Sequence, residues 1–73
     1  MTIEELLAKF LGVPVDRISD DTAMKNTPEW DSLKHVEIIV GLEQHYSIDL
    51  TGDEIAEMIS LSRIKDTLHK RGL

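Results

Sequence analysis

Apolar residues recur at helical spacing in four segments of this 73-residue chain, and no segment of useful length alternates as a strand would. The first helix is expected over residues 2–11, and the second, the longest, over residues 32–46. A short third helix is expected after residue 51, and a fourth follows it towards the end of the chain. The pattern therefore predicts an all-α fold, a small four-helix bundle with three longer helices and one short helix.

The expected helix ends carry capping signals. Each helix is preceded by a side chain that can accept hydrogen bonds from first-turn N–H groups: Thr2, Asp31, Thr51 and either Ser60 or Ser62. Glu5 and Glu54 stand three residues after the two threonines and complete capping-box patterns. Gly72 is expected to end the last helix, because glycine readily adopts the left-handed conformation found there.

The second helix carries apolar residues on more than one side: Leu33, Val36, Ile38, Ile39, Val40, Leu42 and Tyr46. A helix of this kind is expected to lie centrally and to touch neighbours on several sides. Gly41 within it costs about 1 kcal/mol relative to alanine. Close packing of another backbone is the expected reason for this glycine.

Residues 12–31 form a long connection that is poor in the glycine and serine typical of flexible linkers. Connections of this length in a small domain are often functional or have local order. Five apolar residues are expected to pin this one onto the helices: Val13, Val15, Ile18, Ala23 and Met24.

Length and composition predict one domain, residues 1–73, that is soluble and monomeric. The chain has no cysteine, which excludes disulfides, thiolate metal ligands and a cysteine nucleophile and fits a cytoplasmic location. The first residues are acidic, unlike a secretory signal. The longest apolar run, residues 38–40, is far too short to cross a bilayer, so no membrane association is expected.

The formal net charge of −6 is unevenly distributed. Residues 29–57 hold eight acidic side chains against one basic side chain, Lys34, whereas residues 58–73 are net positive. An acidic middle repels nucleic acid and anionic lipid, and it favours encounter with basic patches on proteins.

The sequence offers no metal site. His35, His45 and His69 do not form a ligand set and are expected to be solvated. The stretch Asp49–Glu54 superficially resembles a calcium loop, but its glycine is at the fourth position instead of the sixth, and position twelve is Ser60 instead of glutamate.

Ser32 is the residue on which a functional hypothesis can be built. With Asp31 as N-cap, Ser32 becomes the first helical residue, and its hydroxyl lies beside unpaired backbone N–H groups that suit a phosphate. A role as catalytic nucleophile is disfavoured, because His35 is on the same helix and no oxyanion hole is evident. The chain is therefore expected to be a carrier and not an enzyme.

Over its whole length the chain resembles the acyl carrier protein family. The matching stretches are Asp31-Ser32-Leu33, Val36-Glu37, Leu42-Glu43 and Tyr46-Ser47-Ile48-Asp49-Leu50. The resemblance implies that Ser32 is esterified with 4′-phosphopantetheine, which a phosphopantetheinyl transferase takes from coenzyme A. The thiol of this arm would hold acyl intermediates as thioesters, in fatty acid, polyketide or other biosynthesis.

The resemblance also implies partners, namely acyl-loading and acyl-processing enzymes with basic docking patches. Residues expected to take part in partner recognition are Asp31, Leu33, Val36, Glu37 and Glu54, with Glu43, Asp53 and Glu57 adding negative charge. Fatty-acid carriers commonly have an acid where this chain has Lys34. The Glu29-Trp30 pair resembles stand-alone carriers of specialised pathways, although Trp30 is more simply read as a loop-packing aromatic.

Two other functions fit the sequence. An aminoacyl or D-alanyl carrier would use the same arm with a different cargo. A non-covalent adaptor would be a small acidic bundle that docks a basic partner through charges such as Glu37 or Glu54, with Ser32 merely structural.

Overall fold

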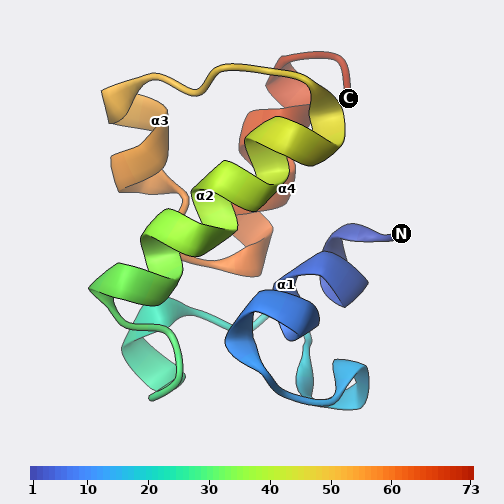
Figure 1. Cartoon of the computed structure of the whole chain (residues 1–73), viewed down its shortest axis with the longest axis vertical. Coiled ribbons are helices and arrows are strands. Elements are labelled where there is room, and N and C mark those ends of the chain that lie inside the picture. Colours follow the sequence, from blue (N-terminus) through green and yellow to red (C-terminus); the bar gives the residue numbers. More distant parts are fainter.

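Helices and turns account for all the regular structure in the computed structural model, which describes residues 1–73. Along the chain these are α1 (Ile3–Leu11), the 3₁₀ turns η1 (Val15–Arg17) and η2 (Met24–Asn26), α2 (Ser32–Tyr46), α3 (Gly52–Glu57) and α4 (Leu61–Lys70). In Figure 1, α2 crosses the centre of the molecule in front of α4, with α1 and α3 on opposite sides of it. The predicted all-α bundle of three longer helices and one short helix is confirmed.

The capping predictions are confirmed at the helix starts. Thr2 Oγ1 accepts a hydrogen bond from the Glu5 N–H at 3.1 Å, and the Glu5 carboxylate accepts one from the Thr2 N–H at 2.9 Å. Thr51 and Glu54 repeat the same box at α3. Ser60, and not Ser62, caps α4 by accepting from the N–H of Arg63 at 3.1 Å. These bonds satisfy N–H groups that have no partner within their own helix.

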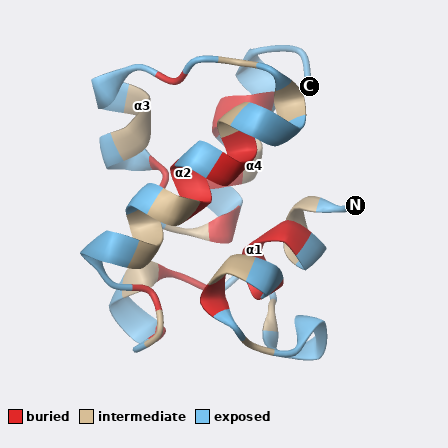
Figure 2. Ribbon diagram, viewed as in Figure 1, coloured by how far each residue is buried: buried red, intermediate tan, exposed pale blue.

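The core is a single cluster to which α1, α2, α4 and three residues of the connecting segments contribute. Its members are Leu6, Leu7, Leu11, Trp30, Ile38, Ile39, Leu42, Leu50, Met58, Leu61, Ile64 and Leu68. Figure 2 shows the buried positions of α1, α2 and α4 turned towards one another. Each fully buried leucine or isoleucine side chain contributes about 1.5–3 kcal/mol, so this cluster is the main source of stability.

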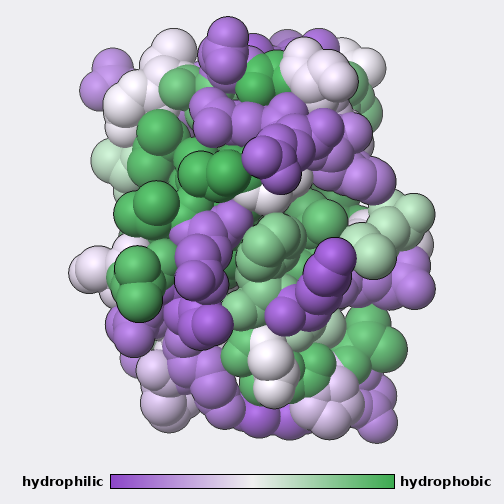
Figure 3. All heavy atoms as spheres, viewed as in Figure 1, coloured by the Kyte–Doolittle hydropathy of each residue, from purple (hydrophilic) through white to green (hydrophobic).

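As expected, α2 has more than one neighbour: it packs against α1, shares the core with α4 and reaches α3 through His35. One side of it is nevertheless open to solvent. Ile38, Ile39 and Leu42 are buried. On the other side, Leu33, Val36 and Val40 are 68%, 59% and 44% exposed. The reason is that α1 packs against α2 along one side, while the α2 and α3 backbones do not approach closely. Figure 3, drawn in the same view as Figure 1, shows hydrophobic side chains at the surface among hydrophilic ones.

The expected reason for Gly41 is wrong. A Cβ atom at this position would overlap the aromatic ring of Phe10, to which its three nearest heavy atoms all belong. Gly41 therefore lets a side chain of α1, instead of a backbone, lie directly against α2.

The connection between α1 and α2 has the local order that was predicted. The side chains of Val13, Ile18, Ala23 and Met24 contact the core or are buried, as expected. Val15 is 49% exposed, so its predicted pinning role is wrong. It lies in the η1 turn, none of whose residues is buried.

Backbone hydrogen bonds also tie this connection to the segment between α3 and α4. The Met24 N–H donates to the Ile59 carbonyl and the Leu61 N–H donates to the Thr22 carbonyl, both at 2.9 Å. They flank an isolated bridge between Ala23 and Ser60. The pairing was not foreseen, because each partner is a short segment without a strand pattern.

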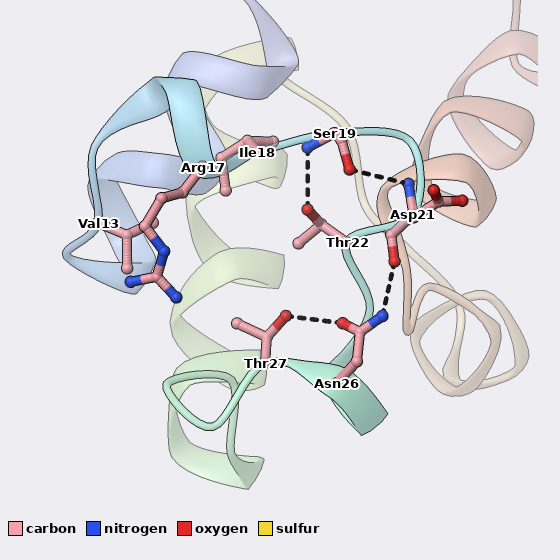
Figure 4. A pocket seen from close by; sticks show the side chains of 8 residues that line it. All are labelled: Val13, Arg17, Ile18, Ser19, Asp21, Thr22, Asn26 and Thr27. Atoms are coloured by element: carbon pink, nitrogen blue, oxygen red, sulfur yellow. Dashed lines mark hydrogen bonds between the residues drawn. The ribbon is translucent and has the colours of Figure 1, made fainter.

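Polar side chains complete the order of the loop. Figure 4 shows Thr22 accepting from the Ser19 N–H, Asn26 donating to the Asp21 carbonyl, and Thr27 donating to Asn26. They line a small cavity of about 190 Å³ to which the Ser32 motif does not contribute. The cavity is part of the loop's own scaffold.

Candidate functional site

The beginning of α2 presents Ser32 to solvent. The Asp31 carboxylate accepts from the Lys34 N–H at 2.8 Å, and the Asp31 carbonyl accepts from the His35 N–H at 2.9 Å. The N–H groups of Ser32 and Leu33 have no acceptor within the chain. Ser32 is exposed, so its hydroxyl lies beside two free donors at the positive end of the helix dipole. This arrangement fits a phosphodiester on the serine oxygen.

Trp30 holds the segment that leads to this helix start. Its side chain is only 2% exposed and belongs to the core cluster, which confirms the expectation that it packs the loop. Its backbone N–H donates to the Thr27 carbonyl at 2.9 Å. The residue two positions before Ser32 is therefore anchored, while Ser32 itself is outside the core.

His35 is not solvated, contrary to expectation. The indole N–H of Trp30 donates to His35 Nδ1 at 3.1 Å, and His35 Nε2 lies 2.8 Å from the carbonyl oxygen of Ile55. The two rings are stacked with centroids 6.1 Å apart. His45 and His69 are exposed, as expected. The only sequence signal for His35 was its position one turn after Ser32, which does not reveal a partner twenty residues away.

An exposed apolar strip follows Ser32 along α2, and we call Leu33, Val36 and Val40 the α2 strip. Val36 and Val40 lie four and eight residues after Ser32, so they share its side of the helix. Together with Phe10 and Gly41 they line an open hollow of about 440 Å³. Of the residues predicted to recognise partners, Leu33 and Val36 are therefore on one continuous surface with Ser32.

The acidic candidates differ in how far their charge is already neutralised. Glu37 pairs with Lys34 at 3.3 Å, and both side chains are well exposed. Glu54 receives hydrogen bonds from Arg71, which also donates to the carbonyl of Asp49 at 2.8 Å. These bonds from Arg71, with the Thr51 N–H bond, lower the pKa of Glu54 to about 2. Glu54 is therefore part of the structure that holds α3.

Two other acids of α3, Asp53 and Glu57, have no ion pair and are exposed. The sequence predicts that they add negative charge to the surface that meets partners. In the structure they present the free negative charge of this helix. The structure contains no cluster of three or more histidine or acidic side chains able to hold a metal ion. None of the helices combines the length and the apolar character that crossing a membrane requires.

The all-α fold and the exposed serine at a helix start are compatible with a carrier protein, and comparison with known proteins shows the class. The family model described as "Phosphopantetheine attachment site" matches residues 2–68. The chain therefore belongs to the acyl carrier protein family of phosphopantetheine-bearing carriers. An acyl carrier protein of Buchnera aphidicola subsp. Baizongia pistaciae (strain Bp) is 28% identical over 68 residues, which cover 93% of this chain and 87% of that protein.

Membership of this family confirms two of the predictions. The cofactor is phosphopantetheine, and the protein is a carrier and not an enzyme. It also implies an encounter with a phosphopantetheinyl transferase, since the arm must be attached.

Proposed function

We propose that Ser32 carries a 4′-phosphopantetheine arm and that the protein delivers acyl groups, held on this arm, to partner enzymes. The proposal rests above all on one observation, the exposed Ser32 beside the unpaired N–H groups of Ser32 and Leu33. The family model also covers this position. The acyl character of the cargo is supported by the relative named as an acyl carrier protein.

Each residue of the motif would have a separate part in attachment. In the transfer, a bond forms between Ser32 Oγ and the phosphorus of the pantetheine phosphate. The P–O bond from that phosphorus to the nucleotide half of coenzyme A breaks, adenosine 3′,5′-bisphosphate leaves with the electron pair, and the hydroxyl proton passes to solvent. Asp31 fixes the helix start through its cap, and the free N–H groups favour the negative phosphodiester. The arm supplies the thiol that a chain without cysteine lacks.

The α2 strip, flanked by Glu37, is the surface that we propose for docking. Leu33 and Val36 are more than half exposed and adjoin Ser32, so an enzyme that reaches the serine must also meet them. Contributions from exposed ion pairs are under about 1 kcal/mol each. Weak contacts suit a carrier that must release one enzyme before it meets the next.

Attachment is tested by incubating the purified apo protein with coenzyme A and a phosphopantetheinyl transferase and measuring the intact mass. We expect the wild type to gain one phosphopantetheine and Ser32→Ala to gain none. Ser62→Ala is the matched control, because Ser62 is an exposed serine in the first turn of α4. An adduct on Ser32→Ala, or no adduct on the wild type, would contradict the proposal.

Docking is tested in the same assay by varying the carrier concentration. Leu33→Ala removes an exposed side chain, so we expect an unchanged melting temperature and a KM raised severalfold at similar kcat. Ile59→Ala is the control, since Ile59 is exposed and apolar but lies outside the α2 strip. Equal KM values for the wild type and Leu33→Ala would remove Leu33 from the docking surface.

A further inference from the structure

His35 in α2 contacts both the segment before α2 and helix α3. It lies one turn after Ser32 in α2, and its two ring nitrogens meet the indole of Trp30 and the carbonyl of Ile55 in α3. The α2 and α3 backbones do not pack closely together, whereas α3 packs against α4. The bond to Ile55 is the one hydrogen bond between α2 and α3.

The two contacts determine the form of the imidazole. The Trp30 indole nitrogen can only donate a hydrogen bond, so Nδ1 of His35 must accept and carries no proton. The proton of the neutral ring is then on Nε2, from which it is donated to the Ile55 carbonyl. A single neutral tautomer thus satisfies both partners, and Trp30 selects the tautomer that can bind α3.

The Ile55 carbonyl is a group that α3 cannot satisfy by itself. The last four carbonyls of a helix have no partner in the next turn. In α3, the Glu54 carbonyl accepts from the Met58 N–H, but the Ile59 N–H bonds to the Glu57 carbonyl and leaves Ile55 without a backbone donor. A helix of six residues is unstable alone. His35 therefore caps the C-terminal end of α3 from another helix.

We propose that His35 is a positioning residue for phosphopantetheine transfer, because it fixes α3 relative to Ser32. This inference rests on the function proposed above. An enzyme that binds at Ser32 meets the α2 strip. The free acids Asp53 and Glu57 belong to α3, the helix that His35 joins to α2 one turn after the serine. If α3 is not held, these charges no longer keep a defined position relative to the serine hydroxyl.

Two variants separate the contacts of His35. His35→Asn places an amide near Nδ1, which keeps an acceptor for Trp30 but does not reach Ile55. His35→Gln places an amide N–H near Nε2, which can still donate to the Ile55 carbonyl. His45→Asn is the matched control, because His45 is an exposed histidine on the same helix. All are loaded from coenzyme A by a phosphopantetheinyl transferase, and amide hydrogen exchange is measured on the apo proteins.

For His35→Asn we expect the KM for transfer to rise about three- to tenfold, the range that loss of one hydrogen bond implies, with kcat within about twofold. Amides of α3 should exchange faster, while those of α1, α2 and α4 keep their wild-type rates. His35→Gln should restore slow exchange in α3 and bring the KM most of the way back to the wild-type value. His45→Asn should match the wild type in both measurements.

Three results would overturn the inference: wild-type KM and exchange for His35→Asn, equal impairment of His35→Gln and His35→Asn, or faster exchange in all four helices alike. The last would mean that His35 only stabilises the whole fold. If the wild type itself accepts no arm, the proposed function fails together with this inference. If the wild type is loaded and the His35 variants behave like it, only this inference fails.

Discussion

Helices α1 and α3 lie on opposite sides of α2 (Figure 1) and are held in place by different forces. Four of the nine residues of α1 are buried: Leu6, Leu7, Ala8 and Leu11. None of the six residues of α3 is buried. Only Ile55 of α3 packs partly against the core, and polar contacts hold the helix at both ends, with Arg71 at its beginning and His35 near its end.

The difference matters because the two kinds of contact respond to different conditions. Burial of apolar surface is non-directional and is roughly proportional to the area removed from water. Hydrogen bonds and ion pairs depend on geometry, protonation and salt. Elements with few buried contacts open most easily in native proteins. We therefore expect α3 to open locally while α1 opens only when the whole molecule unfolds.

The largest expected effect is that of Leu7→Ala in α1. Leu7 is buried in the core cluster, so its truncation should lower the free energy of unfolding by about 2–5 kcal/mol. A domain of this size is expected to have only about 4–11 kcal/mol in total. Urea denaturation followed by circular dichroism should show an earlier midpoint with an unchanged slope, since the transition remains cooperative.

The matched variant in α3 is Ile55→Ala. Ile55 is only partly buried against the core, so the loss of unfolding free energy should be less than half of that for Leu7→Ala. Its main effect should be faster amide exchange confined to α3. A loss as large as that of Leu7→Ala would show that α3 is part of the cooperative core, and the contrast between the two helices would be lost.

The same contrast explains which features could be predicted from sequence. Capping boxes and helical spacing are local signals. Short stretches of sequence were therefore enough to predict the capping box of Thr2 and Glu5, the Asp31 cap and the bounds of α2. The position of Ser32 at a helix start followed in the same way. These signals depend on residues three or four positions apart.

Features that depend on contacts between residues far apart in the sequence could not be predicted in this way. His35 caps a carbonyl twenty residues away, Glu54 pairs with Arg71, and the ring of Phe10 explains Gly41. A sequence pattern shows that a residue is apolar or can form hydrogen bonds, but not which neighbour the fold brings to it. For the same reason, the exposure of Val40 was not foreseen.

The smallest expected effect concerns the Glu54–Arg71 pair at the beginning of α3. Arg71 and the Thr51 N–H lower the pKa of Glu54 from 4.5 to about 2 in the folded protein. A lowered folded-state pKa means that ionised Glu54 favours folding. Its contribution is therefore complete above about pH 4.5 and is lost as the pH falls towards 2. The gap in unfolding free energy between the wild type and Glu54→Gln should be constant from pH 5 to 7 and close towards pH 2.

Comparing the wild type with Glu54→Gln at each pH gives the contribution of Glu54 alone to the free energy of unfolding, because every other acid titrates in both proteins. Glu57→Gln is the control in the same helix, since the Glu57 side chain has no hydrogen bond or ion pair and its gap to the wild type should stay small at every pH. Urea titrations at pH 2, 3, 4.5 and 7 provide the measurement. If the gap for Glu54→Gln does not change with pH, the pair with Arg71 does not hold α3 in solution. The stability of this helix would then depend on packing, as that of α1 does.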